Sequence, residues 1–148
     1  MILSAQSIRK RVGMIVPFSE QTVAYGKTFG LGPAGYDIRI DRNLLLWPKG
    51  FHCADSLEVF NIPTDLKPNV QDKSSWARVG VTVQNTTLEP GWRGILRLEI
   101  TNHSWWFRHI RAGSPIAQVE FNLLDEPTEK PYQGRYQDQG RDQGPIKA

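Results

Sequence analysis

The sequence is divided into short strand-like runs, and this pattern constrains the fold more than any other feature. The runs are bounded by Gly, Pro, Asn or Asp and occupy residues 36–40, 44–47, 51–59, 78–83, 95–101, 107–110 and 116–124. Many short strands separated by turns are typical of a β-sandwich or β-barrel. Only one helix is predicted, because Ser4 can cap a short segment that continues through Ile8 to Val12. We therefore expect an all-β fold with a short N-terminal helix.

The run 94–100 carries the most informative alternation in the chain. A period of two places Ile95, Arg97 and Glu99 on one face of the predicted strand and three aliphatic residues on the other. The aliphatic face is expected to be core. A carboxylate and a cation in mid-strand on the opposite face are costly unless they pair with each other or line a polar site. Glu99 is therefore a candidate functional residue.

Length and composition limit the class of protein. The chain has 148 residues, of which 39% are hydrophobic and 22% charged, so we expect one soluble domain. No apolar run approaches the roughly 20 residues that span a bilayer, and the N-terminal stretch lacks the pattern of a signal peptide. We expect a cytoplasmic protein without a membrane partner. Cys53 is the single cysteine, and its apolar flanks predict a buried, unreactive thiol.

The net charge of +3 suits either nucleic acid or a small polyanion, and the basic residues form no single tract. The aromatic stripe 105–107 lacks an accompanying basic groove, which favours core or a subunit interface over a base-stacking platform. We therefore expect no nucleic-acid partner. Zinc-dependent deaminases need a Cys-x-x-Cys pair in addition to a His-x-Glu motif, and a chain with one cysteine cannot supply it.

Two segments carry groups suited to a phosphorylated ligand. Residues 72–80 combine two cations with the hydroxyls of Ser74 and Ser75, which can donate to several phosphate oxygens, although a turn with solvated charges fits equally well. Trp92 lies between Gly-containing turns, where it could pack in the core or stack on a sugar or base. The composition of 125–148 is that of a disordered tail, yet Tyr132 and Arg135 could close over a phosphorylated ligand.

Taken in order, several segments resemble the trimeric dCTP deaminases and dUTPases. The matching segments are residues 2–18, 35–40, 73–80, 89–94, 98–102, 112–118 and 132–140. The resemblance is closest to the deaminase branch, in a short form, because Glu99 stands where the triphosphatase branch usually has a non-acidic residue. It implies a distorted, jelly-roll-like β-barrel over residues 1–124 that assembles as a trimer, and a tail over residues 125–148 that closes over the nucleotide site.

The resemblance also implies a reaction and a set of site residues. The reaction is zinc-independent deamination of dCTP, with Mg²⁺ carried on the phosphates. Glu99 would be the proton shuttle, while Ser74 and Arg78 hold and polarise groups around the attacked carbon. The phosphate-binding positions that it implies are Lys73, Ser74, Ser75, Tyr132, Arg135 and Gln139. Glu89 and Trp92 fall at the deoxyribose, Thr86 in the connection beside the base, and Tyr136 is a further substrate-binding residue of the tail.

Several departures from the family pattern leave alternatives open, among them a missing segment between Ile40 and Leu44. Lys73 replaces the usual Arg and Glu89 the usual Asp. The connection from Gly80 to Glu89 is shorter than is typical, so the base could be a 5-substituted cytosine. Because the Tyr36-Asp37 pair resembles the triphosphatase version of the first motif, a dUTP diphosphatase or a bifunctional enzyme remains an alternative. A catalytically silent nucleotide-binding barrel is the alternative from a different class.

Overall fold

The computed structural model of the chain describes residues 1–141 and contains eleven strands and two short helices. In chain order they are α1 (Ala5–Arg9), β1 (Ile15–Val16), β2 (Thr22–Ala24), β3 (Lys27–Leu31), β4 (Tyr36–Arg39), β5 (Leu44–Leu46), β6 (Phe51–Asn61), β7 (Leu66–Asp72), α2 (Ser74–Ala77), β8 (Val81–Val83), β9 (Arg93–Asn102), β10 (Arg108–Ile110) and β11 (Pro115–Leu123). The prediction of an all-β fold is confirmed.

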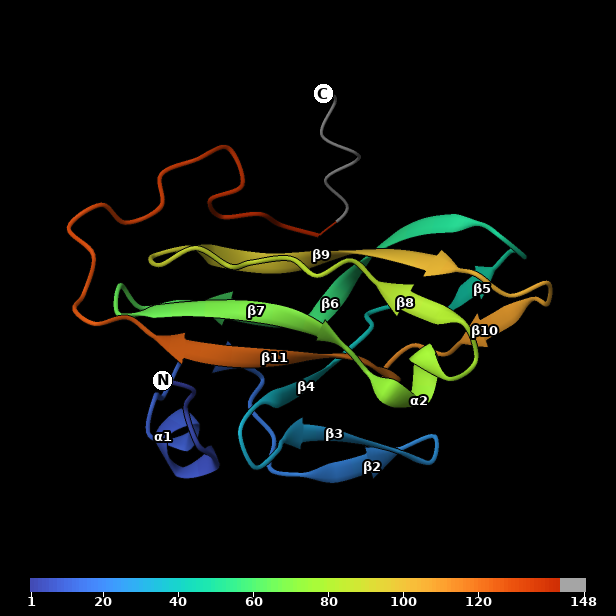
Figure 1. Cartoon of the computed structure of the whole chain (residues 1–148), viewed down its shortest axis with the longest axis horizontal. Helices are drawn as coiled ribbons and strands as arrows, with labels where there is room; N and C mark the ends of the chain where they lie inside the picture. The colour runs from blue at the N-terminus through green and yellow to red at the C-terminus, as the bar shows by residue number, and fades with distance from the viewer. Residues whose placement is uncertain (142–148) are drawn as a thin grey trace.

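Two sheets form the body of the molecule. One has the strand order β1-β6-β9-β8, the other has the order β2-β3-β4-β11-β7, and a separate hairpin pairs β5 with β10. All of these pairings are antiparallel, and the two larger sheets face each other across the core (Figure 1). The core draws on both, since Tyr36 and Phe121 on one sheet and Phe60 and Leu98 on the other are fully buried.

The longest contact runs between β6 and β9, and it positions the polar face of β9. Their register places Cys53 opposite Glu99 and Asp55 opposite Arg97. Leu98 and Ile100 are buried on the core face, whereas Arg97 and Glu99 are only partly buried. The predicted alternation of this strand is confirmed. One face of β9 therefore carries polar residues, while the other face packs against the core.

Several local predictions are corrected by the structure. The helix α1 ends at Arg9, before the predicted Val12, and Ser4 occupies its N-cap without a side-chain capping bond. The strand predicted from Arg78 begins instead at Val81, because α2 occupies the preceding residues and Arg78 is its C-cap. Cys53 is exposed and not buried. It follows the alternation of β6, which points it to the same side as Asp55 and away from the core.

The aromatic stripe 105–107 is also not core. Trp105, Trp106 and Phe107 are 77%, 71% and 52% exposed. The turn that carries them is fixed by Asn102, which is fully buried and donates its side-chain amide to the carbonyl oxygens of Trp106 and Trp47 at 2.8 and 3.1 Å. An ordered turn that presents aromatic rings to solvent leaves the subunit interface as the prediction for this stripe.

In the part of the chain that the structure describes, neither helix is long and apolar enough to cross a membrane.

Candidate active site

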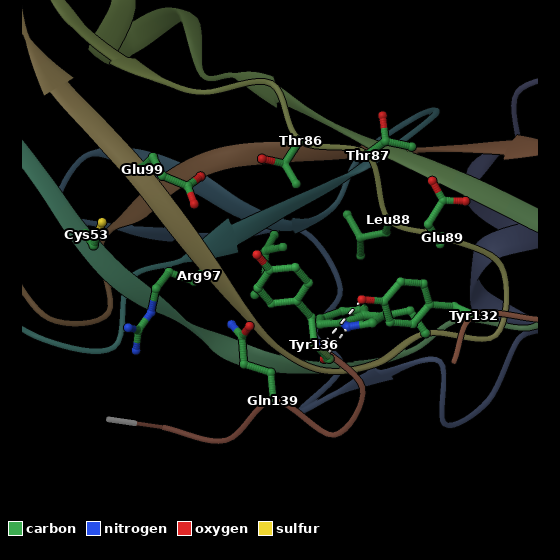
Figure 2. Close-up of a pocket in the computed structure, with 12 residues that line it drawn as sticks. Cys53, Thr86, Thr87, Leu88, Glu89, Arg97, Glu99, Tyr132, Tyr136 and Gln139 are labelled. Atoms are coloured by element: carbon green, nitrogen blue, oxygen red, sulfur yellow. Dashed lines mark hydrogen bonds between the residues drawn. The ribbon is translucent and has the colours of Figure 1, made fainter. Parts of the chain in front are cut away.

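A cavity of about 570 Å³ opens beside the polar face of β9 (Figure 2). Its walls come from β6, β9, the loop between β8 and β9, and the C-terminal tail. The residues that line it are Cys53, Thr86, Thr87, Leu88, Glu89, Trp92, Leu96, Arg97, Glu99, Tyr132, Tyr136 and Gln139. A cavity of this size with few charged groups and several aromatic rings is typical of a small-molecule site.

Glu99 is held in this cavity by the pairing of its own backbone. Its carbonyl oxygen accepts a hydrogen bond from the backbone N–H of Gln84 at 2.9 Å, and Cys53 lies across from it on β6. Burial raises the pKa of the Glu99 carboxyl above its ordinary value, against smaller lowering contributions that include the charge of Arg97 and the hydroxyl of Thr86. A carboxyl that is harder to ionise than usual is suited to both accept and return a proton near neutral pH.

Aromatic side chains form the wall of the cavity opposite Glu99. Trp92 is only 6% exposed and is part of the core, and its indole N–H donates to the backbone oxygen of Tyr136 at 2.7 Å. The Tyr132 hydroxyl accepts a hydrogen bond from the backbone N–H of Tyr136 at 3.2 Å. Trp92 therefore packs in the core and lines the cavity at once, and its donor is already used to hold the tail.

The tail lies along the start of β9 over the residues that the structure describes (Figure 1). Gln139 accepts a backbone hydrogen bond from Ile95 at 2.8 Å and returns one from its side-chain amide to the Ile95 carbonyl at 2.9 Å. Gly94, with a φ of +146°, makes this approach possible, because a Cβ there would lie 2.8 Å from the Gln139 nitrogen. Of the two interpretations of the tail, the structure favours an ordered one up to Arg141. Residues 142–148 lie outside the described residues.

Comparison with known proteins places this geometry in a family. The profile of the dCTP deaminase-like family matches residues 36–124. The chain is 32% identical to a dCTP deaminase of Acidobacterium capsulatum, over 86% of this chain and 87% of that protein. It is also 32% identical to a dCTP deaminase of Pyrococcus furiosus, over 93% and 92% of the two chains. The chain belongs to the dCTP deaminase-like family.

Solved structures share the fold of this family member at low sequence identity. The dCTP deaminase of Agrobacterium tumefaciens superposes with a TM-score of 0.69 at 17% identity, over 82% of this chain and 48% of that longer chain. The EIAV dUTPase superposes with a TM-score of 0.60 at 15% identity, over 82% of this chain and 98% of that one. The dUTPase-type fold predicted from the resemblance is therefore confirmed.

The predicted site residues fall into two groups in this dCTP deaminase-like chain. Those that line the cavity are Glu99, Thr86, Glu89, Trp92, Tyr132, Tyr136 and Gln139. Those that do not are Lys73, Ser74, Ser75, Arg78 and Arg135. Except for Arg135, every residue of the second group lies on or directly beside α2. One chain therefore does not bring the three predicted catalytic residues Glu99, Ser74 and Arg78 into one cavity.

The helix α2 presents its predicted catalytic groups to solvent. Trp76 anchors it, because the indole is 9% exposed and its N–H donates to the Pro115 carbonyl at 2.7 Å. Ser74 and Arg78 are exposed on the same short segment. The Ser75 hydroxyl is buried and has no hydrogen-bond partner among the described residues. The segment is thus anchored by Trp76 and exposes Ser74 and Arg78, while the Ser75 hydroxyl is buried.

Lys73 is already engaged in this structure. Its ammonium lies 2.6 Å from the Asp37 carboxylate, and both side chains are 11% exposed. Gln118 donates to the other oxygen of Asp37 at 3.2 Å. Lys73, which the resemblance assigns to phosphate binding, thus ties α2 to β4. Binding Asp37 and binding a phosphate compete for this one ammonium group.

Sequence reasoning missed several residues in and beside the site, among them Cys53 and Asp55. Cys53 lines the cavity opposite Glu99, and Asp55, which is 1% exposed, binds Arg97. Both follow from the period of two applied to residues 51–59, which would have placed Cys53 and Asp55 on one face. The alternation of residues 51–59 is visible in the sequence, but the apolar flanks of Cys53 favoured a buried thiol.

No group of three His, Cys, Asp or Glu side chains among residues 1–141 is arranged to hold a metal ion.

Proposed function

We propose that this chain deaminates dCTP to dUTP by hydrolysis, with Glu99 as the proton shuttle. The observation that carries the proposal is Glu99 itself, a half-buried carboxyl with a raised pKa in a small-molecule cavity. Membership of the dCTP deaminase-like family supports it, as do relatives named dCTP deaminase that match nearly their full length.

In the proposed reaction the Glu99 carboxylate takes a proton from water, and the oxygen of that water bonds to C4 of cytosine. The proton passes to N3, so that C4 becomes tetrahedral. A second proton moves from the new hydroxyl through Glu99 to the amino group. The C4–N bond then breaks, and ammonia and dUTP leave. General acid–base groups of this kind contribute roughly 10²- to 10⁴-fold in rate.

The rest of the cavity suits the sugar and the base. The faces of Trp92 and Tyr132 offer apolar contact, and Glu89 can accept a hydrogen bond from a sugar hydroxyl. The Thr86 side chain lies on the same side of the cavity as Glu99, and we assign it to the base (Figure 2). We assign Tyr132, Tyr136 and Gln139 of the tail to the phosphate end, with Arg135 as a cation that approaches when ligand binds.

The cavity of a single chain offers few cations to bind a triphosphate, which supports a site shared between copies. Arg97 is the only cation among the described residues that line the cavity, and Asp55 already binds it. We propose that a second copy in a homotrimer supplies α2, with Ser74 and Arg78 at the reacting carbon and with Lys73 and Ser75 near the phosphates. The exposed aromatic rings at 105–107 belong to the surface that such an assembly would cover.

Magnesium is assigned to the substrate phosphates, and no metal is assigned to the cytosine ring. Mg²⁺ keeps several waters and is commonly bound through phosphates, so it needs no protein cage. We expect a zinc-selective chelator to leave turnover intact and the omission of magnesium to weaken it. Stoichiometric zinc in the purified active protein would contradict the assignment.

A dUTP diphosphatase, alone or combined with deamination, is the second candidate. It is favoured by the similarity to dUTPases, which this fold covers almost completely. Incubation with Mg²⁺ and dCTP, 5-methyl-dCTP or dUTP separates the candidates when ammonia and pyrophosphate are both measured. We expect ammonia from dCTP and no pyrophosphate. Pyrophosphate from dCTP would indicate the bifunctional enzyme, and pyrophosphate from dUTP without ammonia from dCTP would overturn the proposal. Comparing ammonia release from dCTP and from 5-methyl-dCTP shows which cytosine the enzyme prefers.

A further inference from the structure

Arg97 and Glu99 are placed so that they could neutralise each other. They are two residues apart on the same face of β9, and both line the cavity. Residues i and i+2 of a strand lie about 7 Å apart, which is within the reach of an arginine side chain. In a partly buried cavity, opposite charges at such positions attract strongly. An ion pair between Arg97 and Glu99 is therefore the arrangement that the sequence favours.

The structure shows a different pairing. The Arg97 guanidinium donates two hydrogen bonds to Asp55, at 2.8 and 3.2 Å, in the bidentate geometry of a strong pair. Asp55 is the cross-strand neighbour of Arg97 and is 1% exposed. Figure 2 shows the guanidinium extending away from the centre of the cavity, while the Glu99 carboxylate turns toward Thr86. The second arginine at Asp55, Arg42, lies 3.5 Å from it.

The other groups around Glu99 provide no competing cation. They come from β6, from the loop after β8, and from the tail. The polar ones that line the cavity are Cys53, Thr86, Thr87, Glu89, Tyr132, Tyr136 and Gln139, and Asp55 lies beside them on β6. Within one chain, the ionisation of Glu99 therefore depends on where the Arg97 guanidinium is held. Burial is the largest influence on the Glu99 pKa, and it outweighs the opposing charge of Arg97.

We propose that Asp55 is a positioning residue that sequesters Arg97 and so keeps the Glu99 carboxylate unpaired and able to take a proton from water. The catalytic consequence rests on the proposed function, whereas the sequestration is a property of the unliganded protein. If Arg97 were released, it would bind Glu99, favour its ionised form and weaken it as a base. The guanidinium would also occupy the space beside the carboxylate that a water needs.

The test measures the ionisation of Glu99 directly. The side-chain carboxyl carbon of Glu99 is titrated by NMR in the unliganded protein and is assigned by its absence in Glu99→Gln. In Asp55→Asn the neutral amide cannot hold Arg97 against a carboxylate, so we expect the titration midpoint to fall by roughly half a pH unit or more. In the double variant Asp55→Asn with Arg97→Gln, we expect the midpoint to return to or above that of the wild type. A purely structural role of the pair would not produce this reversal.

The matched control is Asp65→Asn. Asp65 binds Arg11 in a bidentate pair at 2.7 and 2.8 Å away from the cavity, so its loss is expected to leave the Glu99 midpoint in place. In deamination assays, Asp55→Asn is expected to lose about tenfold or more in kcat/KM at neutral pH, and the double variant to recover most of that loss.

Asp55 is buried, so Arg97→Gln alone supplies a second test in case Asp55→Asn does not fold. Sequestration predicts that this variant moves the Glu99 midpoint by less than about half a pH unit, since Arg97 is committed elsewhere. A larger rise would mean that Arg97 pairs with Glu99 in the wild type and would overturn the proposal. So would an unchanged midpoint in folded Asp55→Asn. These results stand apart from turnover, so absence of dCTP deamination would contradict the proposed function without affecting the sequestration.

Discussion

The cavity around Glu99 and the helix α2 carry the two halves of the predicted catalytic set, and they are built in opposite ways. Glu99 lies on a long strand paired on both sides, with the core beneath it and the tail beside it. The helix α2 has four residues, is anchored by Trp76, and exposes Ser74 and Arg78. Among residues 1–141, the first region encloses a cavity whose one lining cation, Arg97, is bound by Asp55, and the second presents donors to solvent without enclosing a cavity. The cavity around Glu99 and the donors of α2 complement each other. We therefore propose that the two regions, from two copies of the chain, form one site.

The difference also explains the electrostatics of each region. Partial burial raises the pKa of Glu99, which costs folding free energy whenever that carboxyl is ionised. A carboxyl kept at such a cost is a candidate for a role in chemistry, which agrees with the role proposed for Glu99.

The largest expected effect is on turnover, and it tests the enclosed region. Glu99→Gln keeps the shape of the side chain and removes the proton shuttle, so we expect the deamination rate to fall by about 10²- to 10⁴-fold. Binding of dCTP, measured by calorimetry, should stay within a few-fold. Turnover above a tenth of the wild-type rate would remove Glu99 from the mechanism.

An intermediate effect is expected where the tail meets the cavity. Trp92→Phe removes the indole donor to the Tyr136 carbonyl and costs about 1 to 2 kcal/mol. Because the tail is assigned to the phosphate end, we expect KM for dCTP to rise roughly tenfold with a smaller change in kcat. Arg93→Ala is the control, since it removes only the exposed ion pair with Asp138 and should change KM by about twofold or less. Equal effects of the two variants would argue against the tail assignment.

The smallest effect concerns stability and has a defined pH dependence. The pKa of Glu99 is raised in the folded state, so the wild-type protein loses stability as pH rises from the ordinary value of 4.5 through the raised one. Glu99→Gln avoids this loss. We expect its Tm to exceed that of the wild type at pH 8 and the two values to converge at pH 4. A variant that is less stable than the wild type at pH 8 would contradict the electrostatic account of the cavity.

The strand that carries Glu99 was predictable because its alternation is strict, whereas four other strands were missed for physical reasons. The strand β1 has only two residues, which show no periodicity. Pro68 and Asn69 read as turn residues, yet β7 is an edge strand of its sheet, where a proline costs no ladder hydrogen bond. Gly30 lies inside β3, and a glycine is typical of a loop in a sequence; its φ of +87° is one that other residues rarely adopt. The strand β2 has only three residues, too few for a period of two to appear.

The site was predictable by residue type more than by arrangement. The resemblance identified Glu99, Ser74 and Arg78, but no periodicity in the sequence indicates that α2 faces away from the cavity of its own chain. The engagement of Lys73 by Asp37 joins residues 36 positions apart, and only the register of the folded sheets brings them together. Long-range pairings of this kind are the part of the site that local patterns do not encode.

Complementation between two inactive variants tests the shared site most directly. Glu99→Gln and Arg78→Ala are each expected to be inactive with dCTP, and each should be a trimer by light scattering. After mixing, mild dissociation and reassembly in equal amounts, a site that draws Glu99 from one copy and Arg78 from another is intact in about a quarter of cases. We therefore predict recovery of roughly a quarter of the wild-type rate. A reassembled mixture that stays inactive, or a wild-type protein that is monomeric at active concentrations, would contradict the account.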